Sequence, residues 1–524
     1  MRKLFFLLAS MLWLCTTAQA QNAVNNALRN PVIPGFHPDP SVCRVGNDYY
    51  LVNSSFQYFP GVPVFHSTDL QTWQQIGNVL NRPSQLPLTG LTSWQGIYAP
   101  TIRHHQGTYY MITTLVGAPE GQSGNFLVTA KHPAGPWSEP VRLKQGGIDP
   151  SLYFEGRKCY MVSNPDNTIT LCEIDPKTGR QLSESRPLWQ GTGGRWPEGP
   201  HIYKRGCYYY LLISEGGTEL AHSITVARSK HIYGPYEANP KNPILTHCSL
   251  KAQDSQIQGT GHGDLVETAD GKWWMTFLAY RHFNGSYHHL GRETFIAPVE
   301  WSDDGWPVVN GGEPIVLNEP PAKTVFCGFD KPLGPEWVYI QNPDTTAYRM
   351  QEGAMRLYGN VHEMYENRQP TFVGIRQESP VFTMDTKIVE SDLEDGDEGG
   401  LCVYQSNEGY VQCCLNNFRG FPRIKLRLYL KGVRTLLVDR PIPMDRANQV
   451  WLRVKSDGKK YDFYYSFDGD KYTWIESVHC SLLSTETVGG FTGVTLGIYA
   501  QMGSTKIQAG RSYADFEYVE YREE

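Results

Sequence analysis

The feature that most constrains the fold of this chain is a short pattern that recurs five times between residues 39 and 266. The copies are Asp39–Val42, Ala99–Ile102, Asp149–Leu152, Glu198–His201 and Gly263–Val266. Ten residues after the start of each copy there is an aromatic pair or near-pair, from Tyr49-Tyr50 to Trp273-Trp274. A repeat of about 50 residues is the length of one propeller blade. The pattern therefore predicts a five-bladed β-propeller.

Three of the five copies carry a carboxylic acid at the same phase, namely Asp39, Asp149 and Glu198. Equivalent positions of propeller blades converge on one central axis, so we expect these acids to share a pocket. Asp-Pro is also a common turn starter, and a single acid of this kind would favour a structural role. Three acids at one phase favour function instead. Glycoside hydrolysis needs two carboxyl groups on opposite sides of a sugar, and a third acid nearby would raise the pKa of the proton donor.

The length and texture of the chain predict two domains, both all-β. A chain of 524 residues is too long for one ordinary core. Short β-type runs between turn residues fill the part up to residue 317, and longer, cleanly alternating runs such as 423–430 follow a Pro-containing stretch at 318–323. We predict the propeller over residues 21–320 and a β-sandwich over residues 325–524.

The first twenty residues are typical of a secretory signal peptide. Arg2 and Lys3 precede an apolar run from 5 to 14, and Ala18-Gln19-Ala20 resembles a cleavage site. The apolar run is too short to span a bilayer, and we expect no stable membrane insertion. We predict cleavage after residue 20 and export to the periplasm or the extracellular space.

Charge and cysteine usage exclude several other classes of protein. The net charge of −6 argues against a nucleic-acid partner, because phosphate binding needs a basic surface. Ten cysteines remain after the signal, without the tight spacing of a disulfide framework. We interpret those in strand-like runs as small buried apolar residues. No Cys/His spacing suggests a zinc site.

Five ordered motifs resemble those of glycoside hydrolase family 43. They are Phe36–Ser41, Gly147–Ser151, Trp196–Pro200, Gly259–Gly263 and Gly291–Phe295. The part from Phe329 onward is similar to the concanavalin-A-like jelly roll of the β-xylosidase and α-L-arabinofuranosidase branch of that family. The resemblance implies an inverting hydrolase. By motif, Asp39 is the general base, Glu198 the general acid, and Asp149 the residue that tunes the pKa of Glu198 and orients it.

The same resemblance suggests residues that bind the sugar. Arg292 would hydrogen-bond the sugar in the innermost subsite, and Phe56 would pack against it. His262 would lie near the propeller axis, where the family often places a water-coordinated ion, commonly calcium, although no cofactor is required. Tyr98 stands where the family often has Trp, so the pocket wall is expected to differ there.

Several readings of the substrate and activity remain open at this point. A terminal α-L-arabinofuranosyl residue of hemicellulose-derived oligo- or polysaccharides is the favoured substrate, and β-D-xylosidase or bifunctional activity is the alternative. Retaining fructan or sucrose hydrolases share the architecture, but their Asn-Asp-Pro-Asn motif is replaced here by His37-Pro38-Asp39-Pro40. A non-catalytic carbohydrate-binding propeller is a further alternative. We expect an exo-acting pocket closed by a sandwich loop, for which residues 418–421 are a candidate.

Overall fold

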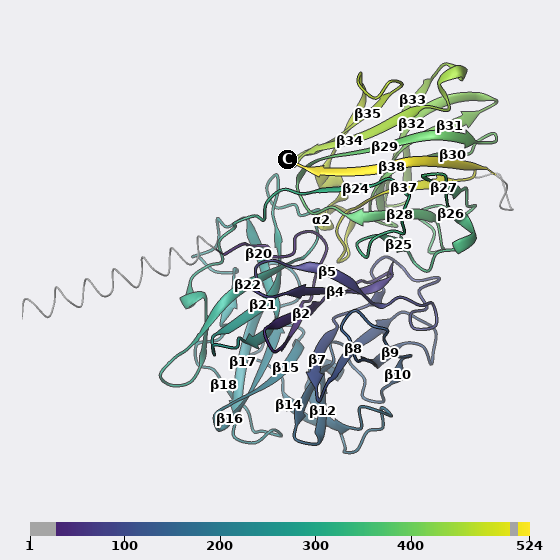
Figure 1. Cartoon of the computed structure of the whole chain (residues 1–524). Coiled ribbons are helices and arrows are strands. Elements are labelled where there is room, and N and C mark those ends of the chain that lie inside the picture. Colours follow the sequence, from purple (N-terminus) through teal and green to yellow (C-terminus); the bar gives the residue numbers. More distant parts are fainter. Residues whose placement is uncertain (1–27, 504–511) are drawn as a thin grey trace, which may run out of the picture.

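A computed structural model describes residues 28–503 and 512–524, and the predicted signal peptide lies outside the described residues. Nearly all regular structure is β, arranged as a propeller and a two-sheet sandwich side by side (Figure 1). The helical pieces are α2(Thr485–Val488), η1(Pro165–Asn167), η2(Asn310–Gly312), η3(Thr345–Ala347), η4(Met444–Arg446) and η5(Cys480–Leu483). Within the described part of the chain, no helix is long and apolar enough to cross a membrane.

The propeller has five antiparallel sheets, one for each copy of the repeat. Blade 1 contains β1(Ser41–Val45), β2(Asp48–Val52), β4(Gly61–Ser67) and β5(Gln74–Leu80). Blade 2 contains β6(Gly96–Ile97), β7(Thr101–His105), β8(Thr108–Val116), β9(Gly124–Ala130) and β10(Val141–Arg142). Blade 3 contains β11(Ser151–Glu155), β12(Lys158–Ser163), β13(Ile169–Ile174) and β14(Arg186–Trp189). Blade 4 contains β15(Glu198–Arg205), β16(Tyr208–Glu215), β17(Ser223–Ser229), β18(Glu237–Ala238) and β19(Leu245–Thr246). Blade 5 contains β20(Ile257–Glu267), β21(Trp273–Arg281), β22(Glu293–Trp301) and β23(Pro307–Val309).

The repeat places the predicted acids at the start of innermost strands. The strands β1, β7, β11, β15 and β20 contact one another around the axis. Asp39 and Asp149 stand two residues before β1 and β11, and Glu198 is the first residue of β15. The aromatic pairs open the second strands, which follow through tight turns such as Gln106-Gly107, where both residues have positive φ, as a type I′ hairpin requires. Local turn chemistry therefore repeats with the same phase as the acids.

One buried carboxylate ties four innermost strands together. Asp264 of β20 accepts hydrogen bonds from Arg103 Nη1 and Nη2 at 2.8 and 3.0 Å, from Ser41 Oγ at 2.7 Å and from Tyr203 Oη at 2.5 Å. Asp264 is fully buried. Burial would raise its pKa, but the Arg103 guanidinium lowers that pKa below its ordinary value. Asp264, the acid of the fifth copy, is therefore paired with Arg103 near the propeller axis and does not line the cavity that contains the other three acids.

The second domain is a sandwich of two sheets. The first sheet contains β24(Thr324–Cys327), β26(Tyr348–Gln351), β27(Ala354–Tyr358), β29(Val381–Asp392), β34(Val450–Asp457), β35(Lys460–Ser466), β36(Thr473–His479) and β38(Tyr513–Glu523). The second contains β25(Val338–Ile340), β28(Thr371–Arg376), β30(Glu398–Ser406), β31(Gly409–Phe418), β32(Phe421–Leu430), β33(Val433–Pro441), β37(Thr495–Gln501) and one strand from the propeller region. Alternating apolar residues of both sheets form the largest buried core of the protein.

The two domains share structure. The borrowed strand is β3(Tyr58–Phe59), which pairs antiparallel with β25 of the sandwich. Tyr58 is fully buried and accepts a hydrogen bond from Thr495 Oγ1 at 2.8 Å. Phe36 and Phe56 of the propeller pack in one cluster with sandwich side chains such as Tyr499. This shared core holds the sandwich against the face of the propeller that carries the acids.

The cysteines follow the interpretation of small buried side chains in most cases. Seven of the ten cysteines in the described ranges are buried, and none of the ten forms a disulfide. Cys207 and Cys248 are exposed.

Candidate active site

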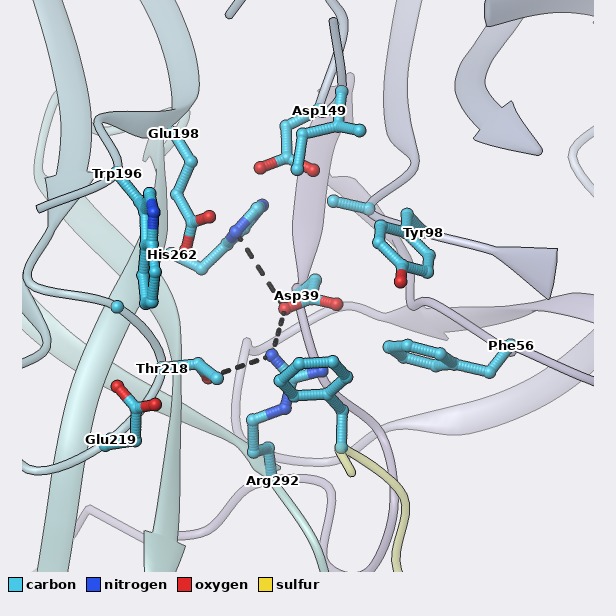
Figure 2. A pocket seen from close by; sticks show the side chains of 14 residues that line it. Asp39, Phe56, Tyr98, Asp149, Trp196, Glu198, Thr218, Glu219, His262 and Arg292 are labelled. Carbon is cyan, nitrogen blue, oxygen red and sulfur yellow. Dashed lines mark hydrogen bonds and ion pairs between the residues drawn. The ribbon is translucent and has the colours of Figure 1, made fainter. Parts of the chain in front are cut away.

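A cavity of about 190 Å³ lies where the innermost strands begin (Figure 2). All seven residues predicted from the sequence line it. They are Asp39, Phe56, Tyr98, Asp149, Glu198, His262 and Arg292. The converging geometry expected from the repeat is therefore present.

Several side chains of this cavity stand on strained backbone. Asp39, Phe56, Asp149, Trp196 and His262 all have φ between 47° and 54°, although none is a glycine. The left-handed region costs such residues free energy, and residues of this kind cluster at functional sites. For Asp39 and Asp149 the following proline adds to the restriction. All five of these side chains line the cavity.

Asp39 is a buried carboxylate held in its ionised form. Its Oδ1 accepts a hydrogen bond from Arg292 Nη1 at 3.1 Å, and its Oδ2 accepts one from Ser54 Oγ at 2.5 Å. His262 Nδ1 lies 3.8 Å from Oδ1. Burial would raise the pKa of Asp39, but Arg292, His262 and Ser54 together lower it below its ordinary value. Asp39 is thus suited to accept a proton at neutral pH.

Glu198, in contrast to Asp39, is held in its protonated form. Burial, followed by the negative charges of Asp149 and Asp39, raises the pKa of Glu198 well above its ordinary value. Its side chain keeps 20% of its surface exposed, toward the cavity it lines. His222 Nε2 lies 3.8 Å from Glu198 Oε1, and burial lowers the pKa of His222 to about 3, so this imidazole is neutral. Glu198 is thus suited to donate a proton.

Asp149 is fastened beside Glu198. Its Oδ2 accepts a hydrogen bond from the backbone N–H of Gly199 at 3.1 Å, immediately after the glutamate. Burial is the main cause that raises the pKa of Asp149 to about 6; the charge of Asp39 acts in the same direction, and His262 acts against it. Asp149 therefore acts on Glu198 both through its charge and through the backbone.

Aromatic and cationic side chains form another wall. Phe56 lies with its ring 5.2 Å from that of Tyr98, and the Arg292 guanidinium lies 5.7 Å from the Phe56 ring centre. The Tyr98 hydroxyl donates to the Trp94 carbonyl at 3.0 Å. The hydroxyl that distinguishes Tyr98 from Trp thus binds the backbone and fixes the ring.

The sandwich contributes Phe491, which the sequence did not single out. Phe491 lines the cavity, its ring lies 6.3 Å from that of Phe56, and the Arg292 guanidinium lies 5.6 Å from its centre. Gly489 and Gly490 before it have φ of 90° and 79°. A Cβ on Gly490 would lie 1.7 Å from Trp94 Nε1, so this position admits only glycine.

The proposal that residues 418–421 close the pocket was wrong. Phe418 and Phe421 pair across the turn between β31 and β32, remain 44% and 60% exposed, and are not among the cavity residues. The loop from Gly489 to Phe491 reaches the cavity instead, because Phe491 stacks on Phe56 and Thr495 of β37 binds the Tyr58 side chain of β3. Those contacts join residues more than 400 positions apart, and no local pattern marks them.

Other cavity residues were also missed. Thr218 Oγ1 accepts a hydrogen bond from Arg292 Nη1 at 3.1 Å, and Glu219 lies beside it at the rim. Trp196 lines the cavity and is 48% exposed. Trp196 stands two residues before Glu198 and begins the family motif Trp196–Pro200, a signal that could have identified it.

The surroundings of His262 do not form a direct calcium site. Calcium takes six to eight oxygen ligands. The nearest described carboxylate oxygen, Asp39 Oδ1, lies 3.8 Å from His262 Nδ1 and is already bound by Arg292. The Ser214 hydroxyl accepts the backbone N–H of His262. These residues fit only an ion held largely through water.

Removing the Phe491 ring is expected to weaken substrate binding. Losing contact between such a ring and a sugar costs about 1–2 kcal/mol, so F491A should raise KM roughly tenfold with little change in kcat. The matched control is F418A, which removes an exposed sandwich phenylalanine outside the cavity. Initial rates on an aryl glycoside measure both. An equal effect of the two substitutions would remove Phe491 from the site.

Comparison with known proteins identifies the family. Residues 28–307 match the model of glycosyl hydrolases family 43, and residues 328–522 match that of the beta xylosidase C-terminal concanavalin A-like domain. The non-reducing end alpha-L-arabinofuranosidase BoGH43B of Bacteroides ovatus is 39% identical, over 98% of this chain and 97% of its own. A xylosidase/arabinosidase of Butyrivibrio fibrisolvens is 38% identical, over 94% of this chain and 99% of its own.

A solved structure agrees with these matches. The Bacteroides ovatus xyloglucan PUL GH43B protein superposes with a TM-score of 0.89 at 39% identity, covering 95% of this chain and 100% of that one. The two matched domains, the five-bladed architecture and the paired acids all lead to one conclusion. The chain is a glycoside hydrolase and belongs to glycosyl hydrolases family 43.

Proposed function

We propose that this enzyme is an exo-acting, inverting hydrolase that releases terminal non-reducing α-L-arabinofuranosyl residues from plant hemicellulose-derived oligo- or polysaccharides. One observation carries the chemistry: in a single small cavity the pKa of Asp39 is lowered and that of Glu198 is raised. Two carboxyl groups with opposite shifts are the signature of a base and an acid at work on one bond.

The roles follow from these protonation states. Protonated Glu198 gives its proton to the glycosidic oxygen as the bond to the sugar breaks. Ionised Asp39 takes a proton from a water molecule that attacks the anomeric carbon from the opposite face, which inverts its configuration. Arg292, held between Asp39 and Thr218, donates hydrogen bonds to sugar hydroxyls. Phe56 and Phe491 cover the sugar, and the small volume suits one terminal residue.

The pH profile tests the role of Asp149. Activity requires protonated Glu198, so kcat/KM should fall as pH rises through the pKa of Glu198. The negative charge of Asp149 raises that pKa. Asp149→Asn removes the charge but keeps an oxygen for the Gly199 N–H, so the alkaline limb should move to lower pH. An unchanged limb with only a lower rate would indicate a purely structural residue.

The identity of the sugar is the finer part of the proposal. Arabinofuranoside is favoured by the name of the Bacteroides ovatus relative, and β-D-xyloside, or both, by that of the Butyrivibrio fibrisolvens relative. Initial rates on 4-nitrophenyl α-L-arabinofuranoside and 4-nitrophenyl β-D-xyloside decide between them. We expect the higher kcat/KM on the arabinofuranoside. A higher value on the xyloside would favour the alternative, and turnover of either excludes a non-catalytic sugar binder.

Two further proposals concern export and calcium. We propose that residues 1–20 are removed and the enzyme acts in the periplasm or outside the cell, on account of the basic, apolar and small-residue pattern of that segment. N-terminal sequencing of the mature protein tests this. A water-coordinated calcium ion near His262 stays a prediction, and the calcium content of the purified protein measures it. The binding partner of the enzyme is its carbohydrate substrate, and none of the residue roles proposed here requires an ion.

A further inference from the structure

Three potential metal ligands meet where blade 5 touches the sandwich, outside the active-site cavity. His282, His288 and Glu486 each offer one ligand atom, and these atoms all lie within 4.8 Å of one another. Among the described residues this is the one group of three or more histidine, cysteine or acidic side chains with such spacing. None of the three takes part in the chemistry proposed above.

The loop after β21 brings the two histidines together. Phe283 and Tyr287 form an isolated antiparallel bridge, with the Phe283 N–H donating to the Tyr287 carbonyl at 2.7 Å. His282 precedes this bridge and His288 follows it, so they stand on opposite sides of the same narrow loop. The Tyr280 ring stacks on His288 at 4.1 Å and lies 5.3 Å from His282. The two imidazoles are therefore positioned by backbone pairing and by a shared aromatic neighbour.

The third ligand comes from the sandwich. Glu486 of α2 accepts a hydrogen bond from the His288 backbone N–H at 3.0 Å, and its other oxygen lies 2.6 Å from His288 Nδ1. The Thr485 N–H donates to the His288 carbonyl at 3.2 Å. Glu486 is thus fixed beside His288 even without an ion, which lowers the entropy cost of assembling a site.

His282 is the ligand without a competing interaction. In residues 28–503 and 512–524, no hydrogen bond or ion pair engages its ring nitrogens. Its ring lines a second cavity of about 900 Å³, together with Leu220 and Cys248. That cavity is an entry path for an ion, which a metal site needs.

We propose that His282, His288 and Glu486 form a binding site for a divalent transition-metal ion, Zn²⁺ in particular, that bridges the propeller and the sandwich. Two imidazoles and one carboxylate suit zinc, whereas calcium and magnesium prefer oxygen ligands alone. Ligands of tetrahedral zinc at its usual bond lengths stand about 3.3 Å apart. The 2.6 Å contact between His288 Nδ1 and Glu486 would open as the ion replaces the proton between them, which is released to solvent, and the His282 ring would rotate toward the pair. Water would take the remaining position.

The proposed metal site lies close in sequence to the loop from Gly489 to Phe491, which reaches the active-site cavity. Glu486 lies five residues before Phe491, and the two glycines Gly489 and Gly490 separate them. On the propeller side, Leu220 of the second cavity follows Thr218 and Glu219 of the first. An ion held by Glu486 would therefore tie α2, and the start of the Phe491 loop, to blade 5.

Isothermal titration calorimetry of ZnCl₂ into the full, metal-stripped chain tests the proposal. We expect one zinc ion per chain and an unfolding temperature that rises with zinc, because the ion binds only the folded state. The variant H282Q removes a ligand without touching the His288–Glu486 pair. Its zinc affinity should fall by roughly tenfold or more, since even outer-shell substitutions at metal sites cost about that much. CaCl₂ should give no comparable binding.

Two control variants isolate the site. His362 and Glu366 form another histidine–glutamate pair, at 3.3 Å, and no third ligand joins it within the described part of the chain, so H362Q should bind zinc like the unsubstituted chain. C248S should also bind normally, although Cys248 is an exposed thiol in the same cavity. Unchanged affinity in H282Q, or a loss in H362Q or C248S instead, would overturn the assignment. A folded E486Q variant should repeat the loss seen in H282Q.

Discussion

Replacing Glu198 by glutamine is expected to slow the hydrolysis of natural arabinosides by roughly two to four orders of magnitude, the usual contribution of a general acid. The amide keeps the size of the side chain but cannot donate a proton as the bond breaks. Substrates whose leaving group needs no protonation, such as 2,4-dinitrophenyl glycosides, should lose far less. The measurement is the ratio of kcat/KM for an oligosaccharide to that for the activated substrate, in both proteins.

The matched control for Glu198 is Glu219→Gln. Glu219 also lines the cavity, but its side chain is 61% exposed and stands at the rim beside Arg195. Its charge makes only a minor contribution to the raised pKa of Glu198, so at a pH well below that pKa the substitution should change the rates on both substrates little and equally. If E198Q lost the same factor on natural and activated substrates, Glu198 would be a binding or structural residue and the proton donor would have to be sought elsewhere.

Replacing Asp39 by glycine should cause the second large loss of activity. Loss of the base should slow every substrate, whatever its leaving group, by roughly two to four orders of magnitude. Glycine accepts the φ of 54° that Asp39 adopts and leaves space on the attacking face. Azide, a nucleophile that needs no base, should then restore part of the rate on activated substrates and yield a glycosyl azide of inverted configuration.

The control for Asp39 is Asp166→Gly, an exposed aspartate with φ of 53° outside the cavity. It tests whether the loss of an aspartate from left-handed backbone by itself disturbs the enzyme, and it should retain full activity. Thermal unfolding of both variants shows that each is folded. Full activity of D39G without azide would exclude Asp39 as the base, and an azide product of retained configuration would contradict inversion.

Much of the site could be predicted because its three acids occupy equivalent positions of a repeated sequence pattern. Asp39, Asp149 and Glu198 occupy one phase of a pattern whose turns and strand starts are set by neighbouring residues. Once the blades close, that phase must face the axis. Arg292, Phe56, Tyr98 and His262 came from motifs of the family, and all of them line the same cavity.

The sequence predicted which acid acts as base and which as proton donor, but it did not show what holds each of them in the required protonation state. The pKa of Glu198 rises because the fold buries it and brings Asp149 and Asp39 near, and that of Asp39 falls because Arg292 Nη1 lies 3.1 Å away. None of these neighbours is adjacent in sequence, and Arg292 follows Asp39 by 253 positions. Electrostatic shifts depend on distance and burial, which only the folded chain defines.

The blades, the phase of the acids and the family could all be predicted from the amino-acid sequence, since they depend on local turn chemistry and on a periodic pattern. Which sandwich loop reaches the sugar depends on tertiary packing. Phe491 is there because β3 joins the sandwich sheet and Gly490 fits against Trp94, and Phe418, equally aromatic, points to solvent. The same holds for His282, His288 and Glu486, which no spacing along the chain brings together. Contacts between distant segments arise from packing of the whole fold, and a linear pattern does not encode them.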